Sequence, residues 1–232
     1  MEQQCRYCGT TGSGKYCKDC GQAFTTKRLT VKGMLQEAFH FFTHLDSGFP
    51  FTLKKLATAP GKMQLEYVQG YRSRYQKPFS MFFICASFAA LVFYWINITL
   101  IKYYDAGNSG EAIFFHKYWV ILQIVLMPVY SFINYLFFRN ATINYAEIVV
   151  YQLYKFSFLF LMIALIHLLK FIFPELQTRY IELPATVLYT VITNFNFFTT
   201  GSRFMVIIKS FVTIALSFLL ASFIQDLLIK KL

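Results

Sequence analysis

Four cysteines near the N-terminus are the residues whose type and spacing most clearly specify chemistry. The chain carries two copies of one motif, Cys5-Arg6-Tyr7-Cys8-Gly9 and Cys17-Lys18-Asp19-Cys20-Gly21. Two residues between the cysteines of a pair let both thiolates face one ion, and the glycine that follows permits the backbone turn that brings N–H groups toward the sulfurs. The pattern predicts a zinc ribbon over residues 1–26, with Cys5, Cys8, Cys17 and Cys20 as the metal ligands.

The predicted zinc ion is structural. Four thiolates complete a tetrahedral shell and leave no open coordination position for catalysis. Zinc binding in small finger peptides contributes on the order of 10–16 kcal/mol, so a segment with few large apolar residues is expected to be disordered without its metal. An iron centre of the rubredoxin type and a redox dithiol are the alternatives for these cysteines. The fifth cysteine, Cys85, lies in an apolar run and is interpreted as a small core residue.

The remaining sequence shows no pattern typical of a soluble enzyme. It contains no nucleophile elbow, no phosphate-binding glycine loop and no paired catalytic carboxylates. We therefore predict that the protein is not an enzyme and has no catalytic residues. An intramembrane lipid-modifying enzyme is a weaker alternative, because no acid–base pair is evident.

The composition is that of a membrane protein. Of the 232 residues, 56% are hydrophobic, 20% aromatic and 14% charged, whereas soluble domains contain about a quarter charged residues. A helix needs roughly 20 residues to cross the hydrocarbon core. Apolar runs of this length predict an all-α integral membrane protein with about five transmembrane helices in residues 79–232, at about 79–100, 119–138, 151–173, 183–199 and 204–228. The third span has an alternative start near Ala146, because the apolar pattern extends back through Val149 and Val150.

Residues 27–78 join the ribbon to the first predicted span. Their helical periodicity predicts an amphipathic helix at about 29–46 and shorter helices at about 52–59 and 61–71. Basic residues gather in this segment and contribute to the net charge of +11. We define the basic collar as Lys54, Lys55, Lys62, Arg72, Arg74 and Lys77.

The basic collar predicts how the chain sits in the membrane. Cations beside a span are retained on the cytosolic side and attract anionic lipid headgroups, which we expect as partners, whereas a nucleic-acid partner is not expected. The polar start of the chain lacks the pattern of a secretory signal peptide. We therefore expect a multi-pass protein with a cytosolic N-terminus, and five crossings would put its C-terminus outside.

Polar residues in the later apolar runs are candidate functional groups. Ionisable groups cost roughly 2.5–3.5 kcal/mol at the centre of a membrane helix, but Glu147 and Lys170 lie near predicted span ends, where snorkelling lowers this cost. His167, Asn194 and Asn196 lie deeper and are the candidates for lining a polar cavity. The alternative is that these three side chains only form hydrogen bonds between helices.

The order of motifs in the first hundred residues resembles a known family. A ribbon of two Cys-x-x-Cys-Gly motifs precedes Thr-Leu-x-x-Leu, then x-Pro-Gly, then Gly-x-Arg-x-x-Tyr-x-x-Pro-Phe at the start of the first span. These positions are Thr52, Leu53, Leu56, Ala59, Pro60, Gly61, Gly70, Arg72, Tyr75, Pro78 and Phe79. The chain is similar to bacterial zinc-ribbon membrane proteins catalogued only as a domain of unknown function. Tyr71 departs from the pattern, which often has a basic residue there.

The resemblance implies an architecture and a bacterial inner membrane location, but no activity. Our leading hypothesis is a non-enzymatic membrane protein whose cytosolic ribbon is an interaction or assembly module, with a protein partner bound through the ribbon. The alternative is an oligomeric channel, pore or transporter, a homo-oligomer in which the ribbon is a gate or sensor.

Overall fold

The computed structural model describes residues 3–25, 28–33, 48–104, 118–139, 143–173 and 175–229. This part of the chain is mostly helical, with a small two-stranded antiparallel sheet at its start. The elements are β1 (Gln3–Gln4), β2 (Thr11–Gly12), α2 (Phe49–Thr58), α3 (Lys62–Val68), α4 (Pro78–Tyr104), α6 (Trp119–Phe138), α7 (Tyr145–Leu168), η2 (Leu169–Phe171), α8 (Arg179–Phe197) and α9 (Arg203–Ile229). Most of the predicted amphipathic helix at 29–46 lies outside the described residues.

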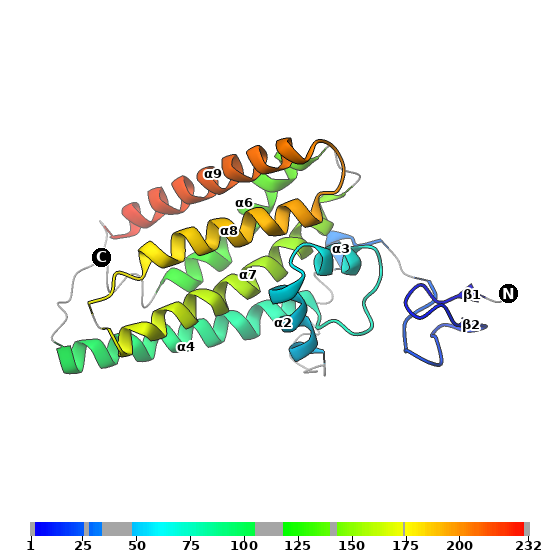
Figure 1. Cartoon of the computed structure of the whole chain (residues 1–232), viewed down its shortest axis with the longest axis horizontal. Coiled ribbons are helices and arrows are strands. Elements are labelled where there is room, and N and C mark those ends of the chain that lie inside the picture. Colours follow the sequence, from blue (N-terminus) through cyan, green and yellow to red (C-terminus); the bar gives the residue numbers. More distant parts are fainter. Residues whose placement is uncertain are drawn as a thin grey trace.

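The five long helices run side by side and alternate in direction along the chain (Figure 1). The short helices α2 and α3 and the cysteine ribbon (residues 3–25) lie at one end of this bundle, which we call the ribbon end. Helix α9 ends at the opposite, far end. From α6 onward, short connections between consecutive long helices explain the antiparallel order, because a chain that turns within a few residues runs back along the preceding helix.

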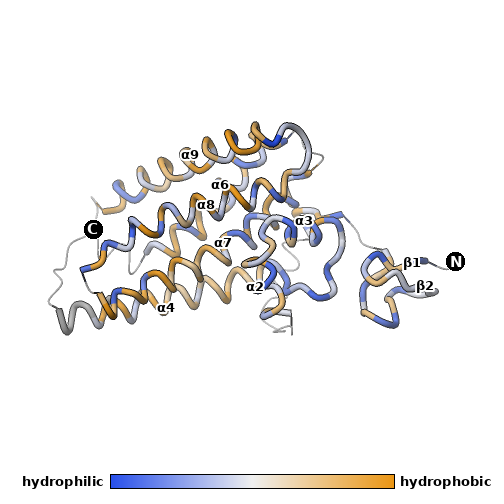
Figure 2. Tube along the Cα trace, viewed as in Figure 1, coloured by the Kyte–Doolittle hydropathy of each residue, from blue (hydrophilic) through white to orange (hydrophobic). Residues whose placement is uncertain are grey.

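Four of the described helical segments are long and apolar enough to cross a membrane: Pro78–Ile96, Trp119–Phe138, Tyr145–Phe171 and Arg203–Ile229. Hydrophobic residues line these helices along their length, whereas hydrophilic residues are frequent around α2, α3 and the ribbon (Figure 2). These four helices support a membrane protein. The fifth predicted span, 183–199, falls on α8, which is more polar and is not among the four, so the number five stays a prediction.

Helix α7 is the central helix of the bundle. It packs against α4, α6 and α8 along its length and against α2 and α3 at the ribbon end. Tyr151 and Tyr154 are fully buried on it, and the membrane-length segment 145–171 is the most buried of the four. Helix α9 buries the least of its surface, and its apolar side chains point outward, as expected of a helix that faces lipid.

Helix α7 starts at Tyr145, next to the earlier of the two starts, near Ala146 and near Tyr151, that the apolar pattern allowed. The reason is a capping box: the Asn144 side chain accepts from the Glu147 backbone N–H at 2.9 Å, and the Glu147 carboxylate accepts from the Asn144 N–H at 2.8 Å. Arg28 pairs with the same carboxylate at 2.9 Å. Glu147 therefore both begins the helix and anchors the segment that follows the ribbon.

A tight contact joins the Pro60-Gly61 turn to α8. Asn196 donates from Nδ2 to the Pro60 carbonyl at 2.8 Å, and Tyr189 donates to the Leu56 carbonyl at 3.2 Å. Gly61 has φ +83°, and a Cβ placed there would overlap the Thr193 carbonyl and the Asn196 side chain. Only glycine satisfies both the backbone conformation and this close approach.

Replacing Gly61 with alanine is expected to lower the melting temperature strongly, because the new methyl group must displace α8. Gly201 is the matched control, since it has φ +91° but nothing within 4 Å of a built Cβ. G201A should cost only the backbone strain of about 1–2 kcal/mol, and G61A about 1–3 kcal/mol more from overpacking. Thermal unfolding in detergent measures both; equal losses would contradict the close contact.

Candidate metal centre

The two cysteine motifs form the same backbone turn. In the first, Cys5 N–H donates to the Thr10 carbonyl at 2.8 Å and Gly9 N–H to the Cys5 carbonyl at 2.9 Å. The second repeats this pattern, with Cys17 N–H to the Gln22 carbonyl at 2.7 Å and Gly21 N–H to the Cys17 carbonyl at 2.9 Å. Gly9 and Gly21 have φ angles of +79° and +70°. Glycine adopts this left-handed conformation without steric cost, which explains the glycine after each cysteine pair.

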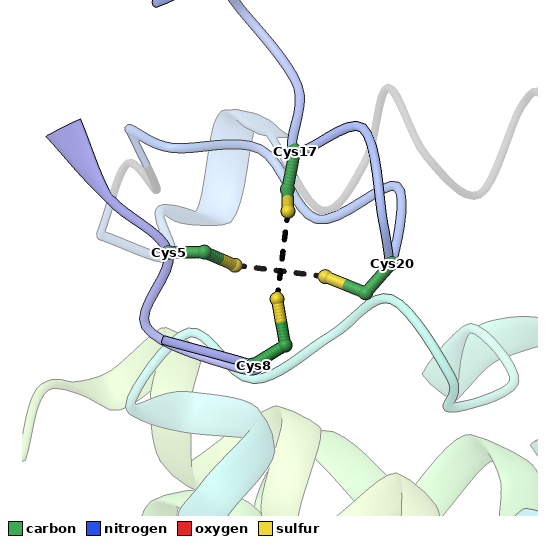
Figure 3. A group of neighbouring side chains, drawn as sticks. All are labelled: Cys5, Cys8, Cys17 and Cys20. Carbon is green, nitrogen blue, oxygen red and sulfur yellow. Dashed lines mark hydrogen bonds between the residues drawn. The ribbon is translucent and has the colours of Figure 1, made fainter. Parts of the chain in front are cut away.

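These turns bring the four sulfurs together. All four Sγ atoms lie within 4.8 Å of one another, and the Cys5–Cys20 and Cys8–Cys17 pairs are 3.5 Å apart. Figure 3 shows the side chains converging on one point from opposite sides. Sulfurs bound at about 2.3 Å in a tetrahedron would be about 3.8 Å apart. The donor set therefore fits a four-coordinate metal ion.

The thiols differ in their environments. Hydrogen bonds with the Thr10 side chain and backbone lower the pKa of Cys8 to about 6, whereas burial raises the pKa of Cys20 to about 12. Four thiolates this close repel one another, so in neutral solution only a bound cation can hold all four deprotonated. Cys5 and Cys17 are 2% and 3% exposed, which closes the inner side of the site to solvent.

Gln22 docks the ribbon onto the turn that leads into α4. Its side-chain Nε2 donates to the Gly70 carbonyl at 2.9 Å, while its Oε1 accepts from the backbone N–H groups of Arg72 and Ser73 at 3.1 and 2.9 Å. The residue is 3% exposed. Its backbone carbonyl meanwhile accepts from Cys17. One residue thus joins a metal-ligand turn to the helical part of the chain.

The turn at residues 70–77 is also fixed from the bundle side. Tyr75 donates to Glu66 at 2.5 Å, and burial raises the pKa of Tyr75, which keeps its hydroxyl a neutral donor. The Gln76 N–H donates to Thr52 Oγ1 at 2.8 Å, and Tyr154 of α7 donates to the Gln76 carbonyl. The turn therefore links the ribbon, α2, α3 and α7.

The basic collar lies on α2, α3 and this turn, at the ribbon end. Lys54, Lys62, Arg74 and Lys77 are exposed, whereas Lys55 and Arg72 are half-buried. Both arginines of the collar also form cation–π contacts. The Cζ of Arg74 lies 5.1 Å from the centroid of the Tyr7 ring of the ribbon, and the Cζ of Arg72 lies 5.4 Å from the centroid of the Tyr67 ring. Arg72 and Arg74 of the collar thus lie where the ribbon docks, and the binding of the collar to headgroups stays a prediction.

The three residues predicted for a polar cavity form separate contacts. Asn194 accepts from Tyr151 of α7 and donates to Ser210 of α9 at 2.9 Å, and Asn196 binds the Pro60 turn as described above. His167 pairs with Glu182 at 2.8 Å. Glu182 precedes Asn194 by twelve residues on α8, which corresponds to roughly 18 Å along the helix. These contacts match the alternative of hydrogen bonds between helices; a cavity shared by all three stays a prediction.

Sequence reasoning missed Gln22 and Lys155, two buried polar residues. Gln22 gives no signal in the sequence, because its role depends on a turn about fifty positions later. Lys155 could have been found: it is a lone cation inside an apolar run, ten positions from the start of α7. It is 5% exposed.

Comparison with known proteins gives one match. The family model described as "Protein of unknown function (DUF3667)" matches residues 46–90, which comprise α2, α3, the 70–77 turn and the start of α4. This match fits the resemblance to a family catalogued only as a domain of unknown function. No curated protein and no solved structure matches the chain.

The metal site predicts a clear difference between cysteines. Purified wild-type protein should contain about one tetrahedrally bound metal ion per chain, and Cys5→Ser should lose it, because Cys5 is one of the four converging ligands. Cys85→Ser is the control, since Cys85 is buried in α4 away from the site. Elemental analysis by mass spectrometry measures both variants. Equal metal content in the two would contradict the site.

Proposed function

We propose that this chain is a non-enzymatic integral membrane protein whose ribbon, held together by a structural zinc ion, is an interaction or assembly module. The observation that carries the proposal is the docking of Gln22 onto the turn before α4. A closed four-thiolate site has no position for a substrate, but it gives a small segment a fixed surface.

Zinc is the metal that this donor set suits best in a structural role. Thiolate ligands select Zn²⁺ or iron among common biological metals, and tetrahedral four-sulfur sites hold either. The two hydrogen-bonded turns and the buried Gln22 give the ribbon a structural task that needs no change of redox state. The ribbon has almost no apolar core beyond Phe24 and the cysteines, so the metal supplies its stability.

The placement of cations supports our proposal of a cytosolic N-terminus, and the resemblance of the first hundred residues supports a bacterial inner membrane. Cations lie at the ribbon end of the long helices: the basic collar before α4, Arg139 directly after α6, and Arg203 as the first residue of α9. Connections on the cytosolic side are enriched in such cations. At the far end, the described residues from the end of α7 to the start of α8 carry both signs, with Lys170, Glu175 and Arg179. The exposed collar residues would then face anionic headgroups.

A second candidate function is an oligomeric channel, pore or transporter with the ribbon as its gate. The observation that favours it is the number of polar side chains buried between the long helices, among them Asn134, Gln152, Lys155 and Asn194. Polar groups at membrane depth are costly and often lie on ion or solute pathways. In the module proposal, no ion or solute crosses the membrane between these groups.

Reconstitution into liposomes that contain a fluorescent ion reporter separates the two functions. The module proposal expects that metal-loaded protein leaves the liposomes tight, and that a protein partner captured through the ribbon is lost in Cys5→Ser and kept in Asn194→Ala. Ion flux through wild-type protein that Asn194→Ala abolishes would overturn the module proposal in favour of the channel.

A further inference from the structure

Lys155 is a buried cation near the middle of the membrane domain. It lies ten residues into α7, roughly 15 Å from the start of that helix, and is 5% exposed. Its Nζ lies 5.4 and 5.5 Å from the ring centroids of Tyr151 and Phe156. Among the described residues, no hydrogen bond or ion pair involves its ammonium group. A buried charge without a counter-charge is destabilising by several kcal/mol.

Two amide side chains nearby also have an unsatisfied atom. Asn134 of α6 and Gln152 of α7 donate to the same acceptor, the Tyr130 carbonyl, at 3.0 and 3.2 Å. Asn134 Oδ1 and Gln152 Oε1 then have no hydrogen-bond partner, although these residues are 3% and 0% exposed. Buried polar atoms without partners are rare, because each loses its hydration without compensation.

These groups belong to one region between α6 and α7. Gln152 precedes Lys155 by three positions, so both lie on one face of α7. The Tyr130 ring stacks on the Phe156 ring, with their centroids 5.5 Å apart. The Lys155 ammonium approaches the same Phe156 ring. Among the described residues, the other buried titratable groups in the middle of these helices are tyrosines: Tyr130 on α6, Tyr151 and Tyr154 on α7, and Tyr189 on α8. No described carboxylate pairs with this lysine.

The unsatisfied groups specify the chemistry of a ligand. A negative charge stabilises the protonated form of Lys155, which offers three N–H donors, whereas the amide oxygens require hydrogen-bond donors. A halide supplies only the charge and leaves both oxygens unpaired. An oxyanion that carries its own hydroxyl supplies both, because an anionic oxygen can accept from Nζ while the hydroxyl donates to an amide oxygen.

We propose that Lys155, Asn134 and Gln152 form a binding site in the membrane domain for a small hydroxyl-bearing oxyanion, with inorganic phosphate as its representative. Phosphate at neutral pH retains at least one O–H, whereas sulfate has the same tetrahedral shape and none. The site is separate from the ribbon, so it does not depend on the role proposed for the metal.

Binding of radiolabelled phosphate to metal-loaded, detergent-purified wild-type protein tests the site directly. We expect saturable binding of about one phosphate per chain, with unlabelled phosphate competing at least tenfold better than sulfate or chloride. Absence of saturable binding overturns the proposal. Equal competition by sulfate also overturns it, because the amide oxygens would then play no part.

Variants locate the binding. Lys155→Met keeps the length of the side chain and removes its charge, and should abolish phosphate binding. Lys209→Met is the matched control. Lys209 lies on α9, another membrane-length helix, and its Nζ is 5.8 Å from the centroid of the Phe138 ring, but the residue is only half-buried. In wild-type protein and K209M, saturating phosphate should raise the melting temperature by roughly 2–4 °C. Unchanged binding in K155M contradicts the assignment, and Gln152→Leu gives a second test should K155M fail to fold.

Discussion

The hydrogen bonds of Gln22 with the backbone of residues 70–73 are the interaction through which the ribbon and the helices become one structure. A glutamine side chain can donate and accept at once, and here it satisfies one carbonyl and two N–H groups of a single turn. Because Gln22 lies two residues after Cys20, its position is fixed only while the cysteine turns are formed. The hydrogen bonds between Gln22 and residues 70–73 therefore depend on the metal site.

From this turn, hydrogen bonds continue into the core. Tyr75 binds Glu66 of α3, Gln76 binds Thr52 of α2, and Tyr154 of α7 binds the Gln76 carbonyl. Helix α7 is the element against which most others pack, so the ribbon is connected to the centre of the bundle through a few polar contacts. The family match at residues 46–90 covers this connecting region.

The sequence predicted what depends on local pattern. Cysteine spacing and the glycines after each pair specified the four cysteines that converge, and apolar runs specified the long helices, because both signals reside in neighbouring residues. The role of Gln22 was not predicted, since it depends on a turn far along the chain. The start of α7 was left open between residues 146 and 151, because the capping box that decides it lies outside the apolar run. Helix α8 shows a third limit of sequence-based prediction. Its inner face carries polar residues that bind α7, α9 and the Pro60 turn. These residues lower the mean hydropathy of α8, so hydropathy does not decide whether this helix spans the membrane.

Hydrogen–deuterium exchange of the backbone amides of Arg72 and Ser73 tests the central claim most directly, because these two amides donate to Gln22. They should be protected in metal-loaded protein and should exchange at least tenfold faster after chelation, while the Gln76 amide, which donates to Thr52, and amides in the middle of α7 keep their protection. Gln22→Leu with its metal bound should show the same local loss, and Gln177→Leu, at an exposed position, should not. Unchanged protection of the Arg72 and Ser73 amides after metal removal would contradict the dependence of these contacts on the ribbon.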